Sequence, residues 1–494
     1  DSTRTVFANK KNSTLFSMPF MFTKEGYKAV DLSKDSPVIK EMFSDRWILG
    51  GEATAVYNNN ELGKITERIR GHYMAEYIDR WGRFLNGMSV NAFSDLQQSR
   101  RILALLADPV YSPILAVLKV TSENTELSPK VPAVKLKNKK AGAIASFFSG
   151  DESTGEGGVF KQTPVDKHFR ELNLLSAAAT GAPTRISGTL LSLRNVQAYL
   201  DEIILAPDIT EAAYNAAKGR MLAGGGDVIK QLRIDASSLP SSVQRWLFTV
   251  ADETWRLVLL NAKSHVNSEW KSLVYRKYLS ALSNRYPLYK NAVDELAVFD
   301  FAEFFKPEGT HDRFVQKYIA PFVEVDDAWT VKRLNGRGLS IAPESIDQMR
   351  RAVRIKGMLF ATNPASPSFS FKMKPYRMDS SVRKFELSFG DQRLRYTHGP
   401  KISKSMNWPG DGGTNVRMTF EDLNDSIKRV TYDGPWALLR LLDESTISPT
   451  RRSNVYHVTF STLGRKATWQ VTARSVNNPF QSQSISRYRC PEAL

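Results

Sequence analysis

The stretch Phe369-Ser370-Phe371-Lys372-Met373-Lys374 alternates apolar with polar residues, as a strand with one buried face requires. The same period of two returns at Phe385–Phe389, Val416–Phe420 and Ala467–Ala473, with turn residues between the runs. Short strands at regular spacing predict a β-sandwich-like C-terminal domain. One helix, from Pro435 to about Asp443, is expected to interrupt these strands.

Before about residue 330 the apolar residues recur instead at every third or fourth position. Between Gly63 and Met88 they predict one face of a helix, through Ile65, Ile69, Tyr73, Tyr77, Trp81 and Leu85. A longer helix is predicted over about 240–283, opened by Pro240 and stopped by Pro287. The predicted fold class is α+β and multidomain, with an N-terminal all-helical region followed by the β-sandwich-like domain with its inserted helix.

The length of 494 residues exceeds what one hydrophobic core usually organises, so several domains are expected. Residues 1–120 are predicted to form the first part of a helical domain. A flexible connection rich in Pro, Lys, Gly and Ser follows at 121–160, and 161–330 continue the helical domain. Residues 331–494 are predicted to form the basic C-terminal domain.

Charge is concentrated in the last third of the chain. Residues 331–494 hold 27 Lys or Arg against 13 Asp or Glu, a balance of +14, whereas residues 1–330 hold 41 against 38. This asymmetry indicates that the C-terminal domain meets an anionic surface, such as an acidic partner, lipid headgroups or nucleic acid. An equally simple reading is that basic side chains on solvent-facing strands prevent edge pairing.

The single cysteine and the most apolar segment bear on compartment and topology. Cys490 rules out an internal disulfide, and its place near the C-terminus predicts a position outside the core. Asp108, Pro109 and Pro113 interrupt the apolar segment Ile102–Val120. Two short buried helices joined by an Asp-Pro turn are therefore expected there, not a membrane span.

No residue pattern in the chain predicts catalysis, a cofactor or a metal. The glycine-spaced loop at 150–155 lacks the Lys and Ser/Thr of a phosphate cradle, and the six histidines lie far apart in sequence. The acidic pairs Asp294/Glu295 and Asp326/Asp327 have no spacing that marks a catalytic pair. Asp300 and Glu303 are expected near a helix start, where negative charge is favoured. We therefore predict no catalytic, cofactor-binding or metal-binding residues.

Four ordered landmarks carry a family resemblance. They are Phe22-Thr23-x-x-Gly26-Tyr27, the long helix ending in Arg285-Tyr286-Pro287, the Phe-rich run Phe299–Phe305, and the segment Gly434–Asp443. With these landmarks the chain resembles the periplasmic part of the IcmF/TssM family of type VI secretion systems. The motif residues, mostly of structural type, are Phe22, Gly26, Tyr27, Tyr286, Pro287, Asp300, Phe301, Phe304, Phe305, Gly434, Pro435, Trp436, Leu442 and Asp443.

The resemblance implies a non-enzymatic scaffold in the periplasm, as the soluble portion of a protein anchored in the inner membrane. Its implied partners are the outer-membrane lipoprotein TssJ, the inner-membrane subunit TssL and other copies of itself, with no small-molecule substrate. We expect the basic C-terminal domain to carry the lipoprotein contact, on loops at 403–413 and 445–454. The candidate residues are Ser403, Lys404, Trp408, Asp411, Thr446, Arg451, Arg452 and Asn454.

Two other functional classes remain as alternatives. One is a peptidoglycan-binding or cell-wall-acting periplasmic protein, which would release muropeptides if it were an enzyme. The other, less favoured, is a basic nucleic-acid-binding protein, because Arg393, Arg395, Tyr396, Lys404 and Trp408 interleave basic with aromatic residues. No known nucleic-acid-binding module fits that stretch, so nucleic acid is not the expected partner.

Overall fold

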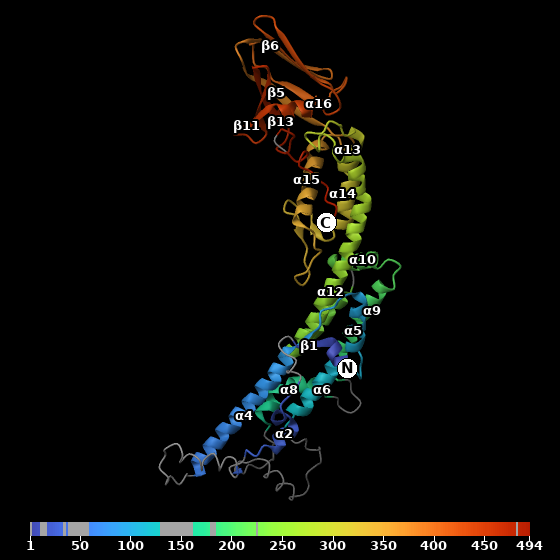
Figure 1. Ribbon diagram of the computed structural model, residues 1–494, viewed down its shortest axis with the longest axis vertical. Helices are drawn as coiled ribbons and strands as arrows, with labels where there is room; N and C mark the ends of the chain where they lie inside the picture. Colours follow the sequence, from blue (N-terminus) through green and yellow to red (C-terminus); the bar gives the residue numbers. More distant parts are fainter. Residues whose placement is uncertain are drawn as a thin grey trace. The chain divides into compact units, whose positions relative to one another are not determined.

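The computed structural model describes residues 2–9, 17–32, 36–37, 59–128, 162–177, 184–223, 226–480 and 483–494. The chain divides into two compact units (Figure 1). Unit 1 comprises Asp1–Ala212 and Gly225–Val258, and unit 2 comprises Ala213–Gly224 and Leu259–Leu494. The domain boundaries predicted from the sequence stay predictions, and residues 129–160 of the predicted connection lie outside the described part of the chain.

Unit 1 is built mainly of helices. They are α1 (Ser2–Val6), η2 (Phe20–Phe22), α2 (Lys24–Ala29), α4 (Asn59–Gly87), α5 (Leu96–Leu106), α6 (Pro113–Thr125), α8 (Pro164–Ser176), α9 (Ser187–Ile204), the start of α10 (Ile209–Met221), α11 (Val228–Ser237) and the first part of α12 (Ser241–Glu269). The predicted face of α4 is confirmed, since Tyr77, Trp81 and Leu85 are buried. Helix α6 continues to Thr125, past the predicted start of the connection at 121.

A small antiparallel pair departs from the all-helical expectation for this region. Strand β1 (Phe7–Asn9) pairs with β2 (Met88–Val90), which begins where α4 ends. The Trp246 indole donates to the Met88 carbonyl at 3.0 Å, and its ring lies 5.0 Å from that of Phe7. Met88 therefore has an extended backbone and packs against α12, although the helical period had placed it in the preceding helix, α4.

The expected pair of short buried helices is confirmed as α5 and α6. Between them Asp108 accepts hydrogen bonds from the backbone N–H groups of Val110 and Tyr111, at 2.8 and 2.7 Å, which fixes the turn. Ser112 caps α6, which has a proline in its first turn. Over the described residues, no helix combines the length and apolar character needed to cross a membrane.

Unit 2 begins with a helical part. Helix α12 leads into the π-helical turns η4 (Trp270–Tyr275) and η5 (Tyr278–Leu282). Together they cover the helical run expected over about 240–283. It is followed by α13 (Val298–Phe305), α14 (Thr310–Phe314), η6 (Val315–Ile319), the strand pair β3 (Val323–Glu324) and β4 (Thr330–Val331), and α15 (Pro343–Leu359). The strand pattern did not anticipate α15.

The remainder of unit 2 forms two antiparallel sheets, as the predicted fold class requires. One has the order β10-β9-β6-β7 and the other β11-β12-β13-β5-β8. Their strands are β5 (Phe369–Met378), β6 (Val382–Phe389), β7 (Gln392–Tyr396), β8 (Lys404–Trp408), β9 (Val416–Asp422), β10 (Ile427–Tyr432), β11 (Thr446–Pro449), β12 (Val455–Thr462) and β13 (Arg465–Ala473). The inserted helix is α16 (Ala437–Glu444).

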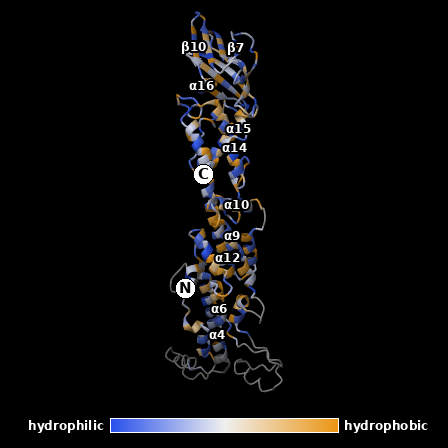
Figure 2. Cartoon of the chain, turned by 90° about the vertical axis from the view of Figure 1, so that its right-hand side faces the viewer, coloured by the Kyte–Doolittle hydropathy of each residue, from blue (hydrophilic) through white to orange (hydrophobic). Residues whose placement is uncertain are grey.

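Alternating side chains form the sandwich core. Phe385 of the four-stranded sheet lies 5.6 Å from Phe460 and 5.9 Å from Trp469 of the five-stranded sheet, measured between ring centroids. In Figure 2 the strands accordingly alternate hydrophobic with hydrophilic residues along their length. All four strands predicted from the period of two are confirmed, with the predicted apolar residues buried.

The C-terminal tail corrects the expectation for Cys490. The thiol is buried, and this burial raises its pKa to about 12. Around it the tail packs on the helical part: the Trp270 indole donates to the Pro491 carbonyl at 2.7 Å, and the Leu494 N–H donates to the Asn267 side chain at 2.8 Å. The residue lies in the core because the irregular tail buries Tyr488 and Leu494, which no periodic pattern signals.

Candidate functional site

The segment after η5 folds back on itself and forms a platform. The Tyr286 N–H donates to the Asp294 carbonyl at 2.9 Å, and the Leu296 N–H returns to the Tyr286 carbonyl at 2.8 Å. Between these bonds the chain passes through Pro287, which was expected to stop the long helix. The helical run already ends at Leu282, because Ser283 is extended and Asn284 has a φ of +59°. The Arg-Tyr-Pro landmark therefore closes a loop over residues 285–296.

Helix α16 is bound to this platform by side chains from the Gly-Pro-Trp landmark. The buried Trp436 indole donates to the Leu296 carbonyl at 2.6 Å, and the Tyr286 hydroxyl donates to the Asp443 carboxylate at 2.9 Å. Burial and the neighbouring Asp443 raise the pKa of Tyr286 far above its usual value, so this hydroxyl stays a donor. Two landmark segments that are 140 or more residues apart in sequence thus meet in one contact.

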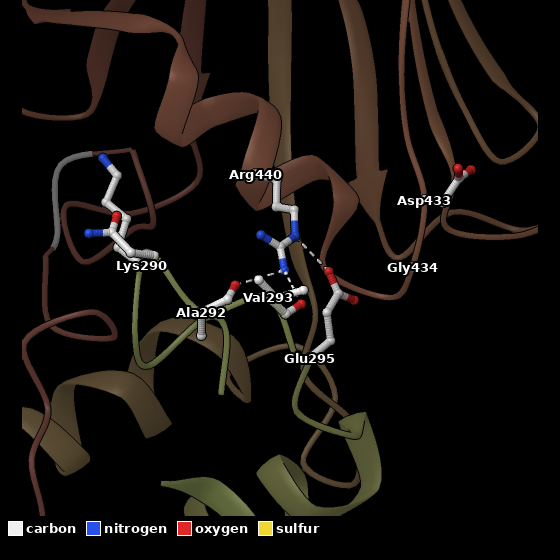
Figure 3. Close-up of a pocket in the computed structure, with 8 residues that line it drawn as sticks. Lys290, Ala292, Val293, Glu295, Asp433, Gly434 and Arg440 are labelled. Carbon is white, nitrogen blue, oxygen red and sulfur yellow. Dashed lines mark hydrogen bonds and ion pairs between the residues drawn. The ribbon is translucent and has the colours of Figure 1, made fainter. Parts of the chain in front are cut away.

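Arg440 completes the contact at the surface of the platform, as Figure 3 shows. Its Nε donates to Glu295 at 2.7 Å, and its Nη2 approaches the carbonyls of Ala292 and Val293 at 3.4 and 3.3 Å. The guanidinium carbon also lies 4.0 Å from the centroid of the Tyr286 ring, within cation–π range. One arginine therefore holds the carboxylate, the loop backbone and the aromatic ring together.

Gly434 explains why the landmark begins with glycine. Its φ is +96°, a conformation that L side chains rarely adopt, and a Cβ there would lie 2.4 Å from Oε2 of Glu295. Both the backbone conformation and the close approach of Glu295 exclude a side chain. The same Oε2 is buried and has no hydrogen-bond partner in the structure.

The Phe-rich landmark forms the floor beneath α16. Phe301 of α13 lies 4.9 Å from Trp436, and Trp436 stacks at 5.4 Å on Trp408 of β8. Phe304 and Phe305 face the tail residue Tyr488, at 6.1 and 5.1 Å. Asp300 lies in the first turn of α13, as expected, but the same expectation was wrong for Glu303, which lies in the second half of this short helix and pairs with Lys306. The landmark therefore joins the helical part of unit 2 to its sheets and its tail.

The remaining landmark, Phe22-Thr23-x-x-Gly26-Tyr27, belongs to unit 1 and begins helix α2. The Thr23 hydroxyl accepts from the Gly26 N–H at 3.1 Å, which caps the helix. A Cβ on Gly26 would lie 1.9 Å from the Phe20 carbonyl oxygen, so no other residue fits. The Trp81 indole donates to the Phe22 carbonyl at 2.9 Å, and Tyr27 stacks on Tyr73 at 6.5 Å.

A shallow hollow of about 650 Å³ opens beside Arg440. It is lined by Lys290, Asn291, Ala292, Val293, Glu295, Asp433, Gly434 and Arg440. The two basic groups of its lining are engaged in the platform itself, because Arg440 pairs with Glu295 and Lys290 lies 3.4 Å from Asp443. This arrangement suits a structural joint, in which charges brace the backbone, better than a reaction site. We call the contacts of residues 285–305 with 434–443 the joint.

The predicted partner-binding residues lie elsewhere, on the five-stranded sheet. The expectation that residues 403–413 and 445–454 are loops was wrong for parts of both, since β8 and β11 are the two edge strands of this sheet. Both are short, and edge strands alternate too weakly over four or five residues to be recognised. Trp408 is 2% exposed, because it packs against Phe369 and Trp436, so its side chain is not at the surface.

The other predicted residues are distributed around the two edges. Ser403 and Lys404 are exposed at the start of β8, whereas Asp411 lies against the β6–β7 turn of the four-stranded sheet, where its carbonyl accepts the Asp391 N–H at 2.8 Å. Thr446 lies in β11, Arg451 and Arg452 are exposed in the turn after it, and the Asn454 amide donates to the Ala473 carbonyl at 3.0 Å. Three strands separate the edges, so the two groups lie roughly 19 Å apart at the usual strand spacing.

The five-stranded sheet has a property that the sequence reading missed. Its five strands contain no Asp or Glu and six basic residues, namely Lys372, Lys374, Arg377, Lys404, Arg465 and Lys466. Lys372 and Lys374 are exposed and alternate with the buried Phe371 and Met373, so they lie on the outer face. The signal was present in the sequence, but the sheet order was needed to bring these strands together.

Comparison with known proteins agrees with these landmarks. Three family descriptions match consecutive parts of the chain: IcmF-related (intracellular multiplication and human macrophage-killing) over residues 1–126, the type VI secretion protein IcmF helical domain over 261–365, and the type VI secretion protein IcmF C2-like domain over 371–475. The chain belongs to the IcmF/TssM family. The joint links the regions matched by the last two of these descriptions.

Individual relatives support the same assignment for this IcmF/TssM family member. The chain is 25% identical over 506 residues to type VI secretion system component TssM1 of Pseudomonas aeruginosa, which covers 99% of this chain and 45% of the relative. The chain thus spans less than half of that relative. Among solved structures it shares its fold with a chain of a type VI secretion system membrane core complex (18% identity, TM-score 0.68, covering 99% of this chain and 92% of the other). A type VI membrane complex also matches (16% identity, TM-score 0.62, covering 93% and 83%).

Proposed function

We propose that this chain is a structural, non-enzymatic part of a type VI secretion membrane complex. The single observation that supports this most is the joint, in which the family landmarks brace one part of unit 2 on another through Trp436, Arg440 and Tyr286. Such contacts hold rigid elements together, and they engage Arg440, Glu295 and Asp443 in the packing of α16 on the platform. The relative TssM1 is itself named as a component of this secretion system.

The proposal extends to location and partners. The chain lies in the periplasm and belongs to a protein anchored in the inner membrane, where TssL and other copies of the chain are its neighbours. It connects this assembly to the outer-membrane lipoprotein TssJ. These partners follow from the family resemblance, and the charge of the last third of the chain gives TssJ a candidate surface.

We propose that TssJ binds the outer face and edges of the five-stranded sheet. The absence of carboxylates from all five strands favours an acidic partner surface, because no like charge opposes it. The exposed Lys372 and Lys374 lie on β5, next to the edge strand β8 and between the predicted residues of the two edges. Ser403, Lys404, Thr446, Arg451 and Arg452 then contribute from the rims, whereas Trp408 only supports β8.

Calorimetric titration of the soluble lipoprotein subunit into the intact chain tests this function. Saturable binding that weakens as salt rises is expected, since charge at the rim of an interface is screened. Absence of binding at low salt would contradict the TssJ contact. Release of muropeptides from peptidoglycan by the same preparation, abolished by an acidic-residue substitution, would instead support the cell-wall alternative.

A further inference from the structure

Three turns meet at one end of the sandwich in unit 2. They are the β5–β6 turn at 379–381, the β9–β10 turn at 423–426 and the β12–β13 turn at 463–464, and we call them the end turns. The Leu423 N–H donates to the Ser381 carbonyl at 3.1 Å, and Asp379 and Lys466 exchange two hydrogen bonds through the Lys466 backbone, at 3.1 and 2.9 Å. Arg465 pairs with Asp422 across the same end. The end turns therefore form one connected surface.

Large apolar side chains project from this surface. Leu463 is 75% exposed, Leu423 is 65% exposed and Ile427, the first residue of β10, is 55% exposed. Isolated exposed leucines are ordinary, but here they occur on two of three adjoining turns, with Ile427 directly after one of them. The core of the sandwich does not account for them.

Leucine is also an unfavourable residue type at position 463 of this turn. Thr462 pairs with Arg465, so Leu463 and Gly464 form a two-residue hairpin loop, with φ values of +47° and +83°. Such turns favour Asn-Gly, because asparagine tolerates positive φ whereas a leucine there is strained. A side chain that is unfavourable for both the backbone and the solvent points to a role outside folding.

The charges around the end turns suit an anionic surface. Four ion pairs hold carboxylates that would repel it: Arg383 with Glu421 and Asp425, Lys384 with Glu421, and Arg465 with Asp422. The Asp379 carboxylate instead accepts the Lys466 N–H. The outer face of the four-stranded sheet carries two rows that run across the strands, the first nearer the end turns and the second toward the opposite end of the strands. They contain Arg395-Glu386-Thr419-Arg429 and Arg393-Ser388-Arg417-Thr431. All four arginines are exposed, and Glu386 is the single acidic residue in the two rows.

We propose that the end turns dock on the surface of a bilayer that contains anionic phospholipids. Leu463, Leu423 and Ile427 enter the interface between headgroups and acyl chains, and Arg395 and Arg429 of the nearer row bind lipid phosphates. A bilayer fits better than a protein partner, because projecting turns offer little of the roughly 800 Å² per side that a stable protein interface needs. A fluid interface adapts to separate projecting side chains. This docking does not require TssJ: it uses the turns at one end of both sheets and arginines of the four-stranded sheet, not the outer face of the five-stranded sheet.

Flotation of the intact chain with vesicles tests the proposal. Vesicles of phosphatidylcholine mixed with phosphatidylglycerol are expected to carry the chain upward, and vesicles of phosphatidylcholine alone to carry about tenfold less, since each nearby Arg favours an anionic surface. Arg395→Gln with Arg429→Gln should reduce this preference. Equal binding to both vesicle types, or no binding to either, would overturn the proposal.

Leu463→Asn separates docking from folding. Asparagine suits the turn, so the variant should unfold at the same temperature as the wild type or higher, yet bind the anionic vesicles about tenfold more weakly because the inserted side chain is lost. Val293→Ser is the matched control, since Val293 is 91% exposed but belongs to the joint. Unchanged vesicle binding by Leu463→Asn, or an equal loss in Val293→Ser, would show that the end turns do not insert.

Discussion

At the scale of single residues, Gly434 and Glu295 show how a family landmark encodes a contact. The Gly434 backbone has a positive φ and carries the Glu295 carboxylate over its Cα, while Arg440 holds the other carboxylate oxygen. The sequence pattern marked Gly434, Pro435 and Trp436 as family residues. It gave no sign of Glu295, because a contact between residues so distant in sequence has no period.

Gly434→Ala is expected to lower the free energy of unfolding by about 2–4 kcal/mol, from positive-φ strain plus the clash with Glu295. Gly336→Ala is the control, because Gly336 also has a positive φ, of +77°, but nothing within 4 Å of its Cβ position. It should cost only the strain, about 1–2 kcal/mol. Urea unfolding of both variants measures the difference. Equal costs would mean that the close approach of Glu295 is unimportant.

A second residue-scale prediction concerns His311. Its ring is buried against Trp270, Phe304 and Tyr488, and this burial lowers its pKa from 6.5 to about 4, with Asp312 opposing and Lys356 adding to the shift. The unfolded chain therefore binds a proton below pH 6.5 that the folded chain does not bind until about pH 4. Stability contributed by the neutral ring is present above this window and is lost as the pH falls through it.

The free energy of unfolding should accordingly fall between about pH 6.5 and pH 5, before most carboxylates titrate, by up to about 2 kcal/mol from His311 alone. In His311→Phe this part of the fall should be absent. Chemical unfolding at a series of pH values measures both proteins. Parallel pH profiles for wild type and variant would contradict the assignment.

At the scale of elements, the period of two identified strands whose inner residues fill the sandwich, such as Phe385–Phe389 and Ala467–Ala473. It missed β10, none of whose residues is fully buried, and the short edge strands β7, β8 and β11. It also missed β12, an interior strand, so edge position does not account for every miss. Edge strands have one neighbour and little core to fill, so their sequences alternate weakly. The joint was predicted as a set of family residues, but its geometry depends on contacts across about 150 residues.

The tail is an element without secondary structure that stabilises unit 2. Tyr488 is fully buried among Tyr278, Phe304 and Phe305, and burial raises its pKa well above the usual value. Tyr488→Ala should lower the free energy of unfolding by about 3–5 kcal/mol. The neighbouring Arg487 is exposed, so Arg487→Ala should change it by less than about 0.5 kcal/mol. Thermal and urea unfolding measure the stability of both variants. A decrease of less than about 1 kcal/mol in Tyr488→Ala would mean that the tail is not part of the core.

At the scale of the whole molecule, the charge of +17 resolves into distinct surfaces within unit 2. The five-stranded sheet offers lysines without carboxylates, and the four-stranded sheet offers arginines beside the apolar end turns. From the total charge alone, it could not be decided whether the basic surface binds an acidic protein, binds lipid headgroups or only faces solvent. The two proposals use different basic residues, Lys372 and Lys374 for one and Arg395 and Arg429 for the other, so they can be tested independently.

The most direct test of the scaffold account is calorimetric titration of TssJ into three forms of the intact chain. Lys372→Glu with Lys374→Glu reverses charge on the five-stranded sheet, and Arg393→Glu with Arg395→Glu makes the same change in total charge on the other sheet. The account predicts that the wild type and the arginine variant bind TssJ with similar affinity, whereas the lysine variant binds at least about tenfold more weakly. Equal weakening in both variants would show that TssJ binding depends only on total charge and not on the five-stranded sheet. No binding by the wild type would contradict the proposed function.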